Sequence, residues 1–114
     1  MERRPPQTKD GEFDFSKLSQ ETNADVIVRV LKFINDNPTL VEKLPDGSVY
    51  YGQKHVGLPS GCGFVAVYAG KPKKIEQIYL GHFLKGKADT FGYLIFDNGQ
   101  GRYTGEWKEG KYHG

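Results

Sequence analysis

The chain has 114 residues, which is room for one ordinary domain and excludes a large α/β enzyme. Hydrophobic residues make up 37%, while glycine alone contributes 15 residues, and the 7 Phe, 7 Tyr and 1 Trp add many aromatic rings. This composition favours short strands, tight turns and a thin core over a helix bundle. The formal net charge of +2 is small for a nucleic-acid-binding surface, so we expect no nucleic-acid partner.

The cysteine content and the hydropathy predict an intracellular protein. Cys62 is the single cysteine, so no internal disulfide is expected. The sequence has no run of 18 apolar residues, and the opening Met-Glu-Arg-Arg-Pro-Pro lacks the apolar core of a secretion signal. We therefore expect the cytoplasm or the cytoskeleton, with a cilium as one setting and an organelle such as the mitochondrion left open.

Residues 1–21 are predicted to form an extended tail, because they combine prolines and many charges with little periodicity. Phe13 and Phe15 are the apolar anchors that we expect to contact a partner protein. Two Phe side chains contribute roughly 3–6 kcal/mol on burial, whereas fixing about 20 backbone residues costs ~20 kcal/mol or more. We therefore expect additional surface, from the repeat body or from another subunit, to order the tail. We expect contacts with other subunits through it, and we expect the isolated protein to be protease-sensitive up to Gln20.

Residues 22–37 are predicted to form the one helix. Thr22 and Asp25 have the spacing of a capping box, in which the hydroxyl accepts a hydrogen bond from an early N–H group. The run Asn-Asp-Asn-Pro at positions 35–38 ends the helix. Apolar residues recur at i, i+3 and i+4 and predict a stripe that packs on a sheet. The stripe consists of Val26, Ile27, Val30, Leu31, Phe33 and Ile34.

Residues 38–114 contain an internal repeat that starts at Tyr50, Tyr79 and Tyr103. Glycine occurs two and seven residues after each of these tyrosines. The first part of the unit has the alternation of a short strand, and the second glycine suits a hairpin turn, so we expect a positive φ at Gly86 and Gly110. Each unit is then a β-hairpin of about 23 residues that buries its face only by stacking on a neighbour. The units cover about residues 50–70, 79–99 and 103–114, and the last is incomplete.

The third unit reads Tyr-x-Gly-x-Trp-x-x-Gly-Lys-x-His-Gly and resembles the MORN (membrane occupation and recognition nexus) repeat. The second unit departs from that pattern at the Trp, the His and the following Gly, and the first keeps the glycines but has lost Trp, Lys and His. The resemblance implies a mainly β fold: an open antiparallel ribbon of roughly six strands, built from stacked MORN β-hairpins, with an N-terminal tail and one α-helix. It also implies a non-catalytic structural or scaffold subunit of a larger protein assembly.

Partner proteins are expected to bind through the aromatic-glycine face and the tail. We expect a spine of rings along the ribbon, formed by Tyr79, Phe83, Tyr93, Phe96, Tyr103 and Trp107. The last hairpin, up to Gly114, has only part of its return strand, so its edge is expected to accept a partner strand. The predicted protein-binding residues are Phe13, Phe15, Tyr79, Phe83, Tyr103, Trp107 and Tyr112.

Two other functions remain open at this point. The step between the first two units is five residues longer than the next step, and the surplus is a basic loop that contains Lys71, Lys73 and Lys74. Each lysine contributes ~1 kcal/mol near an anionic leaflet, so a peripheral adaptor on a membrane or phospholipid surface is the first alternative. The second alternative is a regulatory fragment of a longer enzyme.

The sequence contains no pattern typical of catalysis or metal binding. Cys62 lies between two glycines and is expected to be a small packing residue, and His55, His82 and His113 lack the spacing of metal ligands. No phosphate-binding Gly-x-x-x-x-Gly-Lys-Ser/Thr loop occurs. We therefore expect no enzymatic activity, no cofactor, no metal and no small-molecule substrate.

Overall fold

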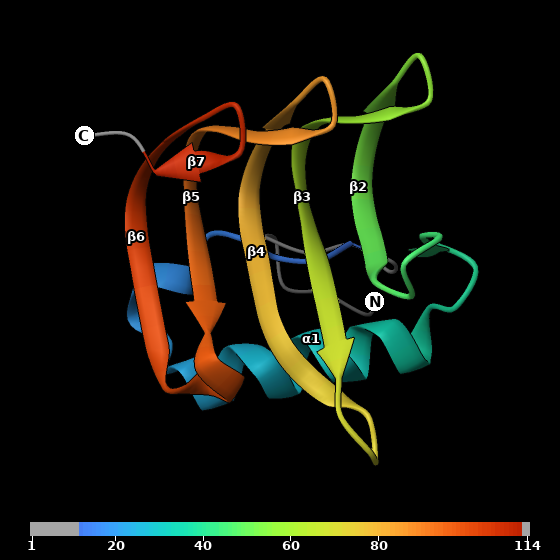
Figure 1. Cartoon of the computed structure of the whole chain (residues 1–114), viewed down its shortest axis with the longest axis vertical. Coiled ribbons are helices and arrows are strands. Elements are labelled where there is room, and N and C mark those ends of the chain that lie inside the picture. The colour runs from blue at the N-terminus through green and yellow to red at the C-terminus, as the bar shows by residue number, and fades with distance from the viewer. Residues whose placement is uncertain (1–11, 113–114) are drawn as a thin grey trace, which may run out of the picture.

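The computed structural model describes residues 12–112 and consists of one open antiparallel sheet and one α-helix (Figure 1). The seven strands of the sheet follow one another in sequence order, so every connection between neighbours is a hairpin or a short turn. The mainly β, open antiparallel architecture is confirmed. The strands are β1 (Glu42–Lys43), β2 (Val49–His55), β3 (Leu58–Ala69), β4 (Lys74–Leu84), β5 (Lys87–Phe96), β6 (Gly101–Lys108) and β7 (Lys111–Tyr112).

The helix α1 spans Asn23–Asp36, as the capping and breaking signals predict. Thr22 Oγ1 accepts a hydrogen bond from the Asp25 N–H at 3.1 Å, which is the expected cap. At the other end, the carbonyl of Phe33 accepts hydrogen bonds from the Asn37 N–H at 2.9 Å and from the Asn37 side chain at 3.0 Å, so Asn37 closes the last turn. In Figure 1, α1 crosses behind the strands and covers one face of the sheet.

The helix-side core lies between α1 and this face of the sheet. Val26 and Val30 of α1 are fully buried against strand residues such as Phe64 and Ile78. Tyr93 packs on this same core, so the expectation that it belongs to the spine on the other face is wrong. Strand alternation explains the difference. The next residue, Leu94, packs with the rings of the other face, so the side chain of Tyr93 must point to the helix side.

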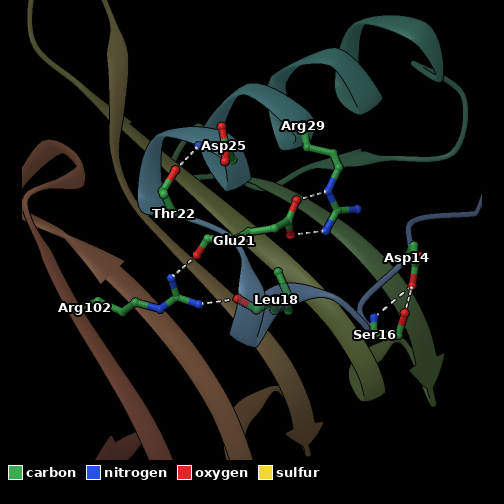
Figure 2. A network of polar contacts seen from close by, with 8 residues as sticks. All are labelled: Asp14, Ser16, Leu18, Glu21, Thr22, Asp25, Arg29 and Arg102. Atoms are coloured by element: carbon green, nitrogen blue, oxygen red, sulfur yellow. Dashed lines mark hydrogen bonds and ion pairs between the residues drawn. The ribbon is translucent and has the colours of Figure 1, made fainter.

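Residues 12–21 pack on the helix-side core and are held there by this chain's own residues (Figure 2). Phe13 is 6% and Leu18 2% exposed, and a 3-10 turn, η1, spans Leu18–Gln20. The guanidinium of Arg102, on β6, donates to the carbonyls of Leu18 and Glu21, at 2.5 and 2.7 Å. Of the two surfaces expected to order the tail, this chain's own core holds residues 12–21. The rest of the expected tail, residues 1–11, lies outside the described residues.

Three two-residue turns join the long hairpins and share one conformation. Each has a positive φ at both central residues, which defines a type I′ turn and matches the twist of the flanking strands. Gly86 and Gly110 have φ values of 85° and 84°, so the prediction of a left-handed conformation at both is confirmed. The central pairs are Val56 and Gly57, Lys85 and Gly86, and Glu109 and Gly110.

Val56 is the unfavourable member of this set. Its φ is 52°, a region that strains β-branched residues, and its side chain is 86% exposed, so no packing compensates the strain. We expect Val56→Asn to raise the free energy of unfolding by about 1 kcal/mol, because Asn tolerates this conformation. Urea unfolding checks the result. Val56→Ile keeps the β-branch and should leave the stability unchanged; an equal gain from Ile would contradict the explanation.

Candidate binding surface

Six aromatic rings form a continuous row on the face of the sheet that α1 leaves uncovered; we call this row the aromatic ladder. Neighbouring ring centroids lie 5.3, 5.1, 5.1, 5.4 and 4.4 Å apart along it. The first four contacts are edge-to-face, the arrangement that suits the ring quadrupoles. In order, the ladder consists of Tyr50, Phe83, Tyr79, Trp107, Tyr103 and Tyr112.

A row of paired glycines lets the tyrosine rings lie flat on the backbone. Five glycines face one another across β2 to β6: Gly52, Gly63, Gly81, Gly92 and Gly105. A Cβ atom at either of the first two positions would meet the Tyr50 ring or hydroxyl within 3 Å, and one at either of the next two would meet Tyr79. Glycine in these strands is therefore required by the close approach of a ring.

Three of the four ladder tyrosines, Tyr50, Tyr79 and Tyr103, use their hydroxyls in the same way. The O–H group donates to the carbonyl three residues later in the same strand: Tyr50 to Gln53 at 2.5 Å, Tyr79 to His82 at 2.8 Å, and Tyr103 to Glu106 at 3.1 Å. The register of the sheet shifts directly after Gly52, between β2 and β3, and directly after Gly81, between β4 and β5. Beyond these points the strands bend, as the tips of the hairpins in Figure 1 show.

The ladder is buried at its first rings and exposed at its last. Tyr50, Phe83, Tyr79 and Trp107 are 2–8% exposed, Tyr103 is half-buried, and Tyr112 is 57% exposed. A groove of about 510 Å³ opens beside the exposed end. Its walls include Tyr79, Phe83, Leu94, Trp107 and Tyr112, and Lys111 also lines it. The groove is thus mainly apolar, with several aromatic rings and a few polar groups, as binding sites for protein segments often are.

Burial of the ladder also changes the acidity of its tyrosines. Burial raises the pKa of Tyr50 to about 12, and burial likewise raises the pKa of Tyr79 above the ordinary value near 10. Both groups are therefore neutral phenols throughout the physiological range, which keeps the ladder apolar.

These pKa shifts predict that stability falls in alkaline solution. The unfolded chain loses the phenolic protons near pH 10, whereas the folded protein keeps them to a higher pH. The contribution of the protonated tyrosines to the free energy of unfolding is therefore complete below pH 10 and is lost as the pH rises to about 12. For Tyr50 the loss is at most about 3 kcal/mol. Urea unfolding between pH 8 and pH 11 measures it. Tyr50→Phe should flatten the decline above pH 10; an unchanged slope would contradict the assignment.

The structure brings five of the predicted binding residues together: Tyr79, Phe83, Tyr103, Trp107 and Tyr112 all belong to the ladder. Phe13 and Phe15 lie on the other side of the sheet, where Phe13 packs on Phe33 and Phe64 with ring centroids 5.7 and 5.1 Å apart. The Phe13 ring is therefore taken up by the core of this chain. Because so little of the Phe13 ring is exposed, the structure gives no support to the prediction that this ring contacts a partner.

The expected spine lacks one ring of the ladder, Tyr50, and includes Phe96, which is not part of the ladder. The signal for Tyr50 is its place in the repeat, which matches that of Tyr79 and Tyr103. Phe96, expected in the spine, lies instead against Gly101 at the start of β6.

The basic loop forms a second surface feature, at the opposite end of the strands from the hairpin tips. Lys71, Lys73 and Lys74 are exposed at the β3–β4 turn. They line a cavity of about 710 Å³ whose apolar wall includes Ile27 and Leu31 of α1. The cavity combines positive charge with aliphatic side chains.

The remaining chemistry of the described residues is limited. Residues 12–112 contain no group of three or more His, Cys, Asp or Glu side chains that could hold a metal ion. Within the same range, no helix has the length and the apolar character that are needed to cross a membrane. Cys62 is a free, half-buried thiol, and burial raises its pKa, which makes it less reactive. His113 lies outside the described residues.

No protein-family model matches the chain, and no curated protein matches it.

Proposed function

We propose that this protein is a MORN-type repeat protein that acts as a non-catalytic structural subunit and binds a segment of a partner protein in the groove at the exposed end of the aromatic ladder. The observation that carries the proposal is the ladder itself. Its rings are fixed by buried neighbours at one end, and at the other end Tyr112 offers a ring that is 57% exposed. Rigid, partly exposed aromatic rings over an apolar groove are typical of binding hot spots.

The fold suits a scaffold in a second way. The groove is formed by neighbouring hairpins that pack on each other, and their tips are tied together by backbone hydrogen bonds. The Gly86 N–H donates to the carbonyl of Pro59 at 2.9 Å, and the Gly110 N–H to that of Ala88 at 2.8 Å. Such a surface requires little reorganisation on binding, which favours affinity. We place the protein inside the cell, where the single thiol of Cys62 stays reduced.

Site-specific photo-cross-linking in cells tests the groove. A photoreactive phenylalanine analogue at Tyr112 should give one discrete cross-linked product, which mass spectrometry then identifies. The matched control carries the analogue at Val28, which is 64% exposed but lies on α1, on the other side of the sheet. Adding Leu94→Lys, which places a charge in the groove wall, should remove the product from Tyr112. Equal products from both positions, or none from Tyr112, would refute the proposed groove.

A peripheral phospholipid-surface adaptor is the second candidate function. The cavity beside Lys71, Lys73 and Lys74 favours it, because the apolar wall supplied by Leu31 and Ile27 accompanies the positive charge. Pelleting with anionic liposomes should retain the protein, and replacing the three lysines by Ala should release it. The control replaces Lys85, Lys87 and Lys108 by Ala, which removes the same charge from the hairpin tips; release by both triple variants would show an effect of net charge alone.

A further inference from the structure

The two connections between repeat units differ in how they meet the helix. The β5–β6 turn packs tightly on α1, since a Cβ atom at Gly99 would lie 2.9 Å from the Ile27 Cδ1 atom. The β3–β4 turn carries the five-residue surplus of the repeat and extends past α1 in Figure 1. The cavity of about 710 Å³ lies between this longer turn and the helix, so the insertion accounts for the cavity.

The lining of this cavity has an apolar part and a positively charged part. The apolar part is Ile27, Leu31, Tyr68 and Ile75. The charged part is the three exposed lysines of the turn, and Glu76 is the one carboxylate among the described lining residues. The ion pairs formed within residues 12–112 leave all three lysines without a carboxylate partner. The cavity therefore suits a ligand that combines negative charge with an apolar group.

We propose that this cavity binds an acidic segment of a partner protein that also carries one large apolar side chain. Carboxylates of the segment pair with the lysines of the turn, and the apolar side chain packs on Leu31 and Ile27. The cavity shares no lining residue with the groove beside the aromatic ladder, so this second binding site goes beyond the function proposed above. Insertions between repeats often lie on the binding face of repeat proteins.

The shape of the site favours a protein segment over a phospholipid surface, the second candidate above. A protein that inserts shallowly into a bilayer needs apolar side chains that project from its surface. Residues 70–73 of the turn read Gly-Lys-Pro-Lys and include no large aliphatic or aromatic side chain. The apolar side chains line the cavity instead, where one inserted side chain can contact them.

Selection from a library of short random peptides tests the proposal on the 114-residue chain. Peptides that also bind the variant in which Lys71, Lys73 and Lys74 are replaced by Gln are removed first. We expect the remaining binders to carry several Asp or Glu residues around one Leu, Ile, Phe or Trp. A synthetic copy of one binder should bind the lysine variant at least about 10-fold more weakly than the original chain, and its affinity should fall as salt is added.

Two substitutions on α1 test the apolar part of the site with the same synthetic peptide. Leu31→Glu places a negative charge in the cavity wall and should weaken binding at least about 10-fold. Val28→Glu is the matched control, because Val28 is 64% exposed on the same helix and does not line the cavity. It should leave the affinity within about threefold. Leu94→Lys, in the ladder groove, should leave it unchanged, so the two sites can fail independently.

Four results would each overturn the proposal. The first is that no peptide survives the removal step, and the second is that the surviving peptides lack either the acidic or the apolar residues. The third is an equal loss of affinity from Leu31→Glu and Val28→Glu. The fourth is lysine-dependent pelleting with anionic liposomes that a saturating amount of the peptide does not displace, which would assign the lysines to a phospholipid surface.

Discussion

Replacing Trp107 by Ala is expected to lower the free energy of unfolding by about 3–5 kcal/mol. The indole is 7% exposed, and its N–H donates to the carbonyl of Gly92 at 3.3 Å. Its ring contacts Tyr79, Tyr103 and Tyr112, at 5.1, 5.4 and 4.9 Å between centroids, so truncation leaves a cavity at the centre of the aromatic ladder. The loss is a large part of the 5–15 kcal/mol that typically stabilises a folded domain.

Chemical denaturation measures this loss, and two further variants show whether the ladder is its cause. Trp107→Phe keeps a ring at the position and should recover part of the stability. Phe91→Ala removes a ring that is 42% exposed on β5 and should cost less than about 1 kcal/mol. If Trp107→Ala and Phe91→Ala had equal effects, the central place of Trp107 would be wrong.

Replacing Gly81 by Ala is expected to destabilise the protein by about 3 kcal/mol or more, or to prevent folding. A Cβ atom at this position would lie 2.5 Å from the Gly92 Cα and 2.6 Å from the Phe91 carbonyl oxygen. Both are backbone atoms of the neighbouring strand, so relief requires β4 and β5 to separate. A single added methyl group therefore disturbs the sheet itself.

Gly57→Ala is the matched control for the glycine row. Gly57 has a φ of 78°, but a Cβ atom there would have no neighbour within 4 Å. The cost should be about 1 kcal/mol, from backbone conformation alone. Thermal or urea unfolding of both variants makes the comparison, and a loss at position 57 as large as that at position 81 would contradict the steric explanation.

Local signals were sufficient for the elements that depend on local chemistry. The Thr22 cap and the Asn-Pro end define α1 because they act within one helical turn. The positive φ at Gly86 and Gly110 followed from their place in the repeat, since a two-residue hairpin turn has few alternatives to glycine there. The glycine spacing likewise indicated where the hairpins begin and turn.

The face occupied by each aromatic ring was harder to predict. Choosing rings by residue type placed Tyr93 in the spine, whereas the alternation Gly92-Tyr93-Leu94 puts it on the helix side. The burial of Phe13 had no local signal at all. It depends on the space between α1 and the sheet, and on the stacking of Arg29 over the Phe13 ring, 4.2 Å from its centroid. Contacts of that kind arise from the assembled core and cannot be derived from spacing along the chain.

The contacts of Arg102 have a consequence for the order in which the chain folds. Its guanidinium binds carbonyls 81 and 84 residues earlier in the sequence, at Glu21 and Leu18. During synthesis, the first structured residues leave the ribosome long before their final partner on β6 exists. Hairpins pair locally and can form first, whereas the N-terminal segment completes its docking only after Arg102 of β6 has emerged. The N-terminal segment therefore docks fully only once β6 is in place. In a nascent chain stalled before Arg102, we expect this segment to stay accessible to chaperones.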